Sequence, residues 1–145
     1  MRISVLGVVM AAAVTGGAIA PMPASADPFD GKTPLLCSAF RLFECDMAGG
    51  CNPVTAKEIG TAGSWTVDFK KKEFTGTTEN AEPNAIGHIE LLDGKLFMTG
   101  VQDGLPVERD GVAWSVAVNS PDGLMTMSAV GEGFVMIGLG SCVPR

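Results

Sequence analysis

The sequence has little from which to build an enzyme active site. It contains no tyrosine and one histidine, His88, so few of its side chains can transfer protons near neutral pH. No serine lies in a Gly-x-Ser-x-Gly turn, the motif that presents a nucleophile above a sheet. The 16 acidic residues offer many carboxylate pairs, but no spacing singles one out. The sequence therefore leaves an enzymatic activity uncertain and favours a protein without one.

Basic residues are also scarce. Ten lysines and arginines stand against 16 acidic residues, which gives a formal net charge of −6. Such a protein repels nucleic acid and anionic membranes. Its one basic run, Lys70-Lys71-Lys72, is flanked by Asp68 and Glu73, which favours a solvated turn over a phosphate site. No nucleic acid is therefore expected among its partners.

Only one long hydrophobic run is present, and it lies at the start of the chain. Residues 3–20 are uncharged, Arg2 precedes them, and Ala24-Ser25-Ala26 is a small-x-small cleavage site. We therefore predict a signal peptide over residues 1–26 and a single domain over 27–145. A retained anchor is the alternative, but the run barely reaches the roughly 20 residues that a spanning helix needs. Export to the periplasm or the medium is expected, with no integral membrane segment after cleavage.

The chain has only four cysteines: Cys37, Cys45, Cys51 and Cys142. In a small exported domain this number predicts two disulfides. We favour Cys45–Cys51, because these residues flank one turn, and Cys37–Cys142, which would tie the two ends of the domain together. Three pairings are open on sequence grounds.

Metal sites have weak support. The cysteine spacings, with seven and five intervening residues, differ from the two to four of zinc knuckles. Met125 and Met127 share one face of a predicted strand and could ligate copper, although methionine also fills irregular core space without any metal. Neither a metal nor a cofactor is expected.

Alternating apolar residues predict antiparallel strands. Residues 64–70 and 112–119 alternate with period two, and 96–101 and 134–139 are apolar on both faces. Short glycine-containing turns separate such segments; they lie at 93–94, 121–123 and 131–133. The pattern predicts an all-β antiparallel meander of about eight strands, in a small barrel or a two-sheet sandwich.

Residues 35–47 are ambiguous. Leu36, Phe40 and Phe43 have helical spacing, but we favour a strand, in which Phe40 and Leu42 share one face and Cys37 lies on the other. A barrel would place this first strand beside the last, so that a Cys37–Cys142 bridge would lock its seam.

Two tryptophans and two loops are the candidate binding elements. Trp65 and Trp114 fall on the predicted inward faces of their strands, where they would either fill the core or line a cavity for a small apolar ligand. The polar segments 77–84 and 102–110 are the predicted contact loops, because rigid β scaffolds present binding residues on loops.

Several segments carry a resemblance to known proteins: 34–37, 114–118, 122–126 and 131–138, together with Cys142. Over most of residues 27–145 the chain resembles small exported proteobacterial proteins to which no activity is assigned. The resemblance implies a stable exported domain and assigns no functional residues. The general build is also similar to that of periplasmic lysozyme-inhibitor barrels, whose inhibitory loop motif is not visible here.

From these features we expect an exported, non-enzymatic β-domain that binds another protein or a component of the cell envelope. A small-ligand carrier barrel is the alternative hypothesis, and an enzyme of unknown type is the least favoured one.

Overall fold

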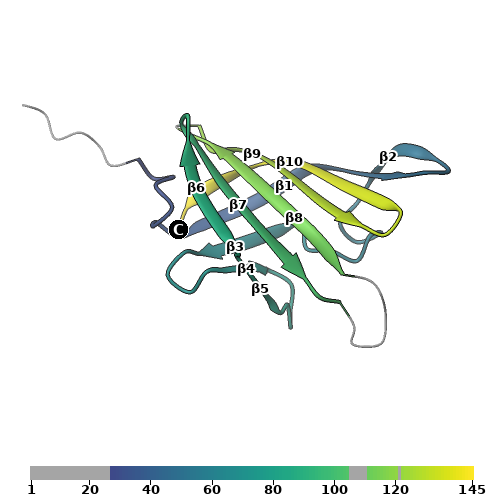
Figure 1. Ribbon diagram of the computed structural model, residues 1–145, viewed down its shortest axis with the longest axis horizontal. Helices are drawn as coiled ribbons and strands as arrows, with labels where there is room; N and C mark the ends of the chain where they lie inside the picture. The colour runs from purple at the N-terminus through teal and green to yellow at the C-terminus, as the bar shows by residue number, and fades with distance from the viewer. Residues whose placement is uncertain (1–26, 105–110, 121) are drawn as a thin grey trace, which may run out of the picture.

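The computed structural model of the protein describes residues 27–104, 111–120 and 122–145. The predicted signal peptide, residues 1–26, lies outside the described residues. Ten strands and no helix occur in the part described, so the predicted all-β class is confirmed (Figure 1). The strands are β1 (Leu35–Asp46), β2 (Gly50–Val54), β3 (Ser64–Asp68), β4 (Glu73–Gly76), β5 (Pro83–Ala85), β6 (His88–Leu92), β7 (Lys95–Gln102), β8 (Val112–Asn119), β9 (Leu124–Gly131) and β10 (Phe134–Pro144). Within the described ranges, no helix is long and apolar enough to cross a membrane.

All ten strands belong to one antiparallel sheet that curls into a half-barrel. Its order is β5-β4-β3-β1-β10-β9-β8-β7-β6, with β2 paired to β1 outside this path. Strands β6 to β10 form the predicted meander. The two ends of the path are joined by Ile86 and Gly87, whose N–H groups donate to the carbonyl oxygens of Lys72 and Thr99 at 2.8 Å. The sheet therefore wraps around one interior.

The first and last strands lie side by side, as predicted, but in the middle of the sheet. Strand β1 pairs with β10 from Leu35↔Pro144 to Asp46↔Phe134, and Cys37 lies directly opposite Cys142. These two cysteines form one disulfide. The strand order ends at β5 and β6, so the bridge cross-links the centre of the half-barrel rather than its edge.

The second disulfide, Cys45–Cys51, links β1 to β2. Both predicted pairings are therefore confirmed, and the structure has no free cysteine in the described ranges. The hairpin of β1 and β2 projects beyond the rest of the sheet (Figure 1, right). The bridge holds the two strands together where few other elements support them.

Aspartates order several of the tight turns. Asp46 accepts hydrogen bonds from the N–H groups of Ala48 and Gly49 in the β1–β2 turn. The side chain of Asn119 and the N–H of Leu124 donate to Asp122 in the β8–β9 turn. These hydrogen bonds favour the ionised carboxylates and lower the pKa of both aspartates below its ordinary value. The turns are therefore best satisfied when both groups are charged.

The hairpin turn at Asp93-Gly94 has the backbone conformation that its sequence predicts. Both residues have positive φ, 50° for Asp93 and 70° for Gly94. Two left-handed residues give a turn whose twist matches that of the flanking strands, and glycine and aspartate adopt this conformation at low cost. The turn fixes the register of β6 against β7.

A β-bulge at Phe40 changes which side chains of β1 face the interior. The register of β1 against β10 shifts between Ala39 and Arg41, so Phe40 is an extra residue. Before the bulge Cys37 faces the core; after it Leu42 does, and both are buried. The prediction that Phe40 and Leu42 share one face opposite Cys37 was therefore wrong. Simple alternation cannot reveal an inserted residue.

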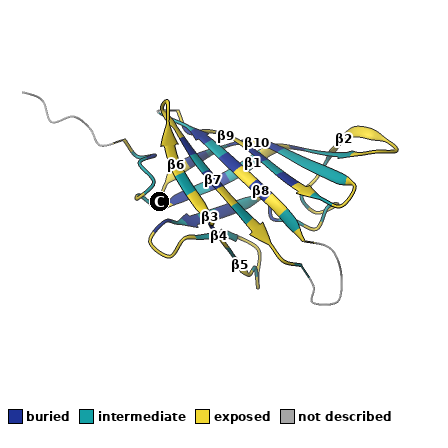
Figure 2. Cartoon of the chain, viewed as in Figure 1, coloured by how far each residue is buried: buried dark blue, intermediate teal, exposed yellow. Residues whose placement is uncertain are grey.

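One end of the half-barrel interior is tightly packed. Side chains with 0–2% exposure meet there from β1, β3, β7, β8, β9 and β10, and they alternate with exposed residues along the strands (Figure 2). These residues are Leu35, Cys37, Val67, Leu96, Met98, Val116, Val118, Met125 and Cys142. Phe29, which is 3% exposed, packs against Gly123 from the segment before β1.

Two predictions differ from the structure. The described residues form ten strands rather than about eight, because β2 and β5 are separate short strands. Strand β2 ends at Val54. Thr55 and Glu58 then exchange hydrogen bonds in a compact turn, where the Thr55 N–H donates to the Glu58 carboxylate at 2.7 Å. The loop predicted at 77–84 includes the start of β5.

Replacing Cys37 and Cys142 together by alanine is expected to lower the free energy of unfolding more than replacing Cys45 and Cys51. The first pair spans 105 residues and the second six. In the chain-entropy model a loop of about 100 residues contributes about 4.7 kcal/mol and a loop of about seven contributes about 2.4 kcal/mol. Urea denaturation of the two double variants measures the difference. Equal losses of unfolding free energy would show that the Cys37–Cys142 bridge stabilises the protein no more than the Cys45–Cys51 bridge does.

Candidate functional site

The opposite end of the half-barrel is hollow. A cavity of about 550 Å³ opens there, within the usual size range of small-molecule sites. We call it the mouth cavity. Its lining residues are Glu44, Ile59, Gly60, Thr61, Ala62, Trp65, Phe74, Gly76, Thr78, Ala81, Glu82, Asn84, Gln102, Gly104, Val112, Trp114, Met127, Ala129, Phe134 and Met136.

One cross-strand row forms the wall of the mouth cavity. Glu44 on β1 lies opposite Met136 on β10, Met136 opposite Ala129 on β9, and Ala129 opposite Trp114 on β8. The row thus carries a carboxylate at one position and an indole three strands away. With neighbouring strands about 4.8 Å apart, the two positions are separated by about 14 Å along the sheet.

Three aromatic rings form the apolar part of the wall. The ring centroids of Trp65 and Phe74 are 5.7 Å apart, and those of Phe74 and Trp114 are 5.1 Å apart. Both pairs are stacked, with interplanar angles of 17° and 25°. Such stacks give a flat, rigid surface at low entropic cost. The predicted inward positions of Trp65 and Trp114 are thus observed, and Phe74 joins them.

Glycine at position 100 makes room for the Trp114 indole. Gly100 lies opposite Trp114 in the β7–β8 pair. A Cβ atom at Gly100 would stand 2.4 Å from Cζ2 of Trp114 and 2.5 Å from the carbonyl oxygen of Ala85. The indole therefore lies flat over the backbone of β7, close to the place where β5 approaches.

The indole N–H of Trp114 has no hydrogen-bond partner among the described residues. The side chain is buried, with 8% of the residue exposed, and its Nε1 atom is closed to water. A buried donor without an acceptor costs about 1–3 kcal/mol. A buried tryptophan N–H usually finds a partner. This orphan donor in a side chain that lines the cavity is the feature of the site that most needs an explanation.

The charges at the mouth cavity are all negative among the described residues. Glu44 and Glu82 line it, and no lysine, arginine or histidine of the described ranges does. Glu44 is half-buried and Glu82 is exposed. Within the same ranges, the ion pairs are Lys71–Glu73 and His88–Glu90, so neither lining glutamate is neutralised by a salt bridge.

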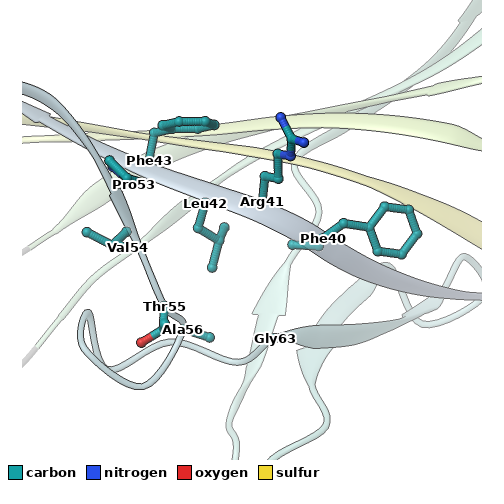
Figure 3. A pocket seen from close by; sticks show the side chains of 10 residues that line it. Phe40, Arg41, Leu42, Phe43, Pro53, Val54, Thr55, Ala56 and Gly63 are labelled. Carbon is teal, nitrogen blue, oxygen red and sulfur yellow. The ribbon is translucent and has the colours of Figure 1, made fainter.

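A second, open hollow, which we call the outer hollow, lies at the edge of β1 that is left free between its pairings with β2 and β3. In Figure 3 the side chain of Leu42 points into this hollow, toward Val54 and Ala56, while Phe43 points to the opposite side of β1. The bulge residue Phe40 lies at its border and is 71% exposed. The hollow has no ionisable side chain other than that of Arg41 among its lining residues.

The two loops predicted as contact regions border the mouth cavity. Segment 77–84 supplies Thr78, Ala81, Glu82 and Asn84, and segment 102–110 supplies Gln102 and Gly104. Residues 105–110 lie outside the described residues. The tryptophans and the loops, predicted separately, thus converge on one cavity.

The other candidate residues do not assemble into a reactive site. His88 Nε2 lies 3.2 Å from a carboxylate oxygen of Glu90, and both side chains are exposed on β6. Met125 and Met127 share the inner face of β9, where both are buried. All four cysteine sulfurs are in disulfides, so none is a thiolate ligand. The described residues contain no cluster of three or more His, Cys, Asp or Glu that could hold a metal.

Sequence analysis missed Phe74 and Glu44 as lining residues. Phe74 follows the basic turn in a short strand, and its alternation with Thr75 is too brief to indicate a face. Glu44 faces inward only because of the bulge at Phe40. No local signal in the sequence reveals either contribution.

Gly100→Ala is expected to destabilise the protein by about 1–3 kcal/mol, because the new methyl group overlaps the Trp114 ring and the Ala85 carbonyl. Gly87→Ala is the matched control, since its Cβ would meet the carbonyl oxygen of Thr99 at an ordinary 3.6 Å. Thermal unfolding followed by tryptophan fluorescence measures both changes. Equal stability of the two variants would contradict the tight approach of Trp114 to β7.

Comparison with known proteins yields no relative for this chain: no protein-family model matches it, and neither the curated proteins nor the solved structures give a significant match.

Proposed function

We propose that this protein is an exported, non-enzymatic binding domain that holds a small amphipathic ligand in the mouth cavity. The observation that carries the proposal is the buried Trp114 N–H, which has no partner among the described residues, in a cavity walled by three stacked aromatic rings. An acceptor atom on a ligand would satisfy this donor once the indole turns its N–H toward the cavity, because the Nε1 atom is closed to water in this structure; the rings would cover the apolar part of the ligand.

The division of the interior supports a carrier rather than a purely structural barrel. The packed end supplies the core that the fold needs, because its largest side chains are 0–2% exposed. Trp65, Phe74 and Trp114 belong to the same buried core, with 4–8% exposure, and the mouth cavity lies against them. Ring atoms that border an empty cavity lack packing partners, which costs free energy. A ligand that fills the cavity removes this cost.

Export to the periplasm or the medium is part of the proposal. Two disulfides tie the described residues together, and disulfides persist in oxidising compartments. The signal peptide predicted over residues 1–26 has the same implication.

A neutral probe tests the binding function. In a Trp65→Phe variant Trp114 is the sole tryptophan, and titration with N-octylacetamide is expected to give a saturable change in its emission. Replacing Trp114 by phenylalanine in the otherwise unchanged protein should weaken binding about fivefold to tenfold by calorimetry, because one hydrogen bond is lost.

Met125→Leu serves as the control for this experiment. Met125 is buried at the packed end and does not line the mouth cavity, so its conservative replacement should leave the affinity unchanged. The absence of any saturable response to N-octylacetamide, in fluorescence and in calorimetry, would overturn the proposed function.

A protein or a component of the cell envelope is the second candidate partner, as the sequence analysis first suggested. The observation that favours it is the 71% exposure of Phe40, a large aromatic side chain at the bulge beside the outer hollow (Figure 3). Exposed aromatic residues of this kind are enriched where proteins bind one another.

Cross-linking in periplasmic extract distinguishes this candidate. A partner captured by the wild type and by Trp114→Phe, but lost with Phe40→Ser, would identify the outer hollow as the contact surface. Equal capture by all three proteins would exclude a role for Phe40.

A further inference from the structure

The charge of the mouth cavity narrows the class of ligand. We infer that the ligand is a cationic amphiphile whose positive group lies against Glu44 and whose apolar part runs along the wall to Trp114. This inference rests on the proposed function and adds the charge of the ligand to it.

The position of Glu44 is the first step of the argument. It is half-buried on the inner side of β1, directly opposite Met136, because the bulge at Phe40 turns this part of the strand around. It has no salt-bridge partner among the described residues. A carboxylate beside a low-dielectric wall attracts a cation more strongly than one in open water.

The rest of the cavity reinforces the same preference. Glu82 adds a second negative charge at the rim, and the described lining contains no basic side chain that could pair with an anionic head group. The faces of aromatic rings attract cations as well, tryptophan most strongly. A carboxylate or phosphate on the ligand would instead meet two like charges and, among the described residues, no cationic partner.

The row Glu44–Met136–Ala129–Trp114 sets the arrangement of groups on the ligand. Met136 and Ala129 separate the carboxylate from the indole, so an apolar segment should lie between the cationic group and the hydrogen-bond acceptor. The two polar positions are about 14 Å apart along the sheet, and less across the curl. A ligand of this kind has a charged end, an apolar middle and an acceptor.

Three probes that share one chain test the charge preference: octyltrimethylammonium, N-octylacetamide and octanoate, each titrated into the intact protein at low ionic strength. The cation is expected to bind at least tenfold more tightly than the carboxylate, with the neutral amide between them. Added salt should reduce the difference, because it screens the interaction with the partly exposed Glu44.

Matched variants locate the charge. Glu44→Gln should weaken binding of octyltrimethylammonium about tenfold and leave binding of N-octylacetamide within twofold of the wild type. Glu132→Gln, in the exposed β9–β10 turn, changes the net charge equally and should leave both affinities unchanged.

The outcomes separate the two proposals. Equal binding of all three probes, or preference for octanoate, would overturn the cationic ligand while leaving the binding function in place. Equal weakening by Glu44→Gln and Glu132→Gln would overturn the role of Glu44. Binding of none of the probes would overturn the proposed function and this inference together.

Discussion

The antiparallel pairing of β1 with β10 is the constraint on which the rest of the structure depends. It joins the start and the end of the domain in the middle of the sheet, and the Cys37–Cys142 bridge fixes its register. Strands β3 to β5 extend from one side of this pair and β9 to β6 from the other. The strands on both sides of this cross-linked pair curl around the same interior. The two ends of the strand order, β5 and β6, are connected through Ile86 and Gly87.

The two ends of the interior differ in how tightly their side chains pack. Near the bridge, Leu35, Leu96 and Val118 pack to complete burial together with the sulfur atoms. Farther along the same strands the side chains no longer fill the space, and Trp65 and Trp114 surround a cavity. The packed core and the cavity therefore share strands, and both tryptophans belong to the two at once.

Much of the fold follows from short-range patterns, whereas the site does not. The alternation around Trp114 and the Asp93-Gly94 turn specify strands and hairpins, because the period of two and the left-handed turn are local properties. The cavity depends on which side chains the curl brings together. Phe74 becomes a neighbour of both tryptophans through the pairing of distant strands, and no local pattern records that pairing. The orphan indole N–H is likewise a property of the packed interior.

The extra residue at Phe40 makes β1 tolerant of a change in its length. Loss of the single codon for Phe40 would restore strict alternation and keep every later side chain of the strand on its present face, because Arg41 already follows Ala39 in the register against β10. Glu44 would still lie opposite Met136, and Phe43 would still point to the other side of the strand. A shorter β1 of this kind would therefore keep both the negative charge of the cavity wall and the cross-linked centre of the sheet.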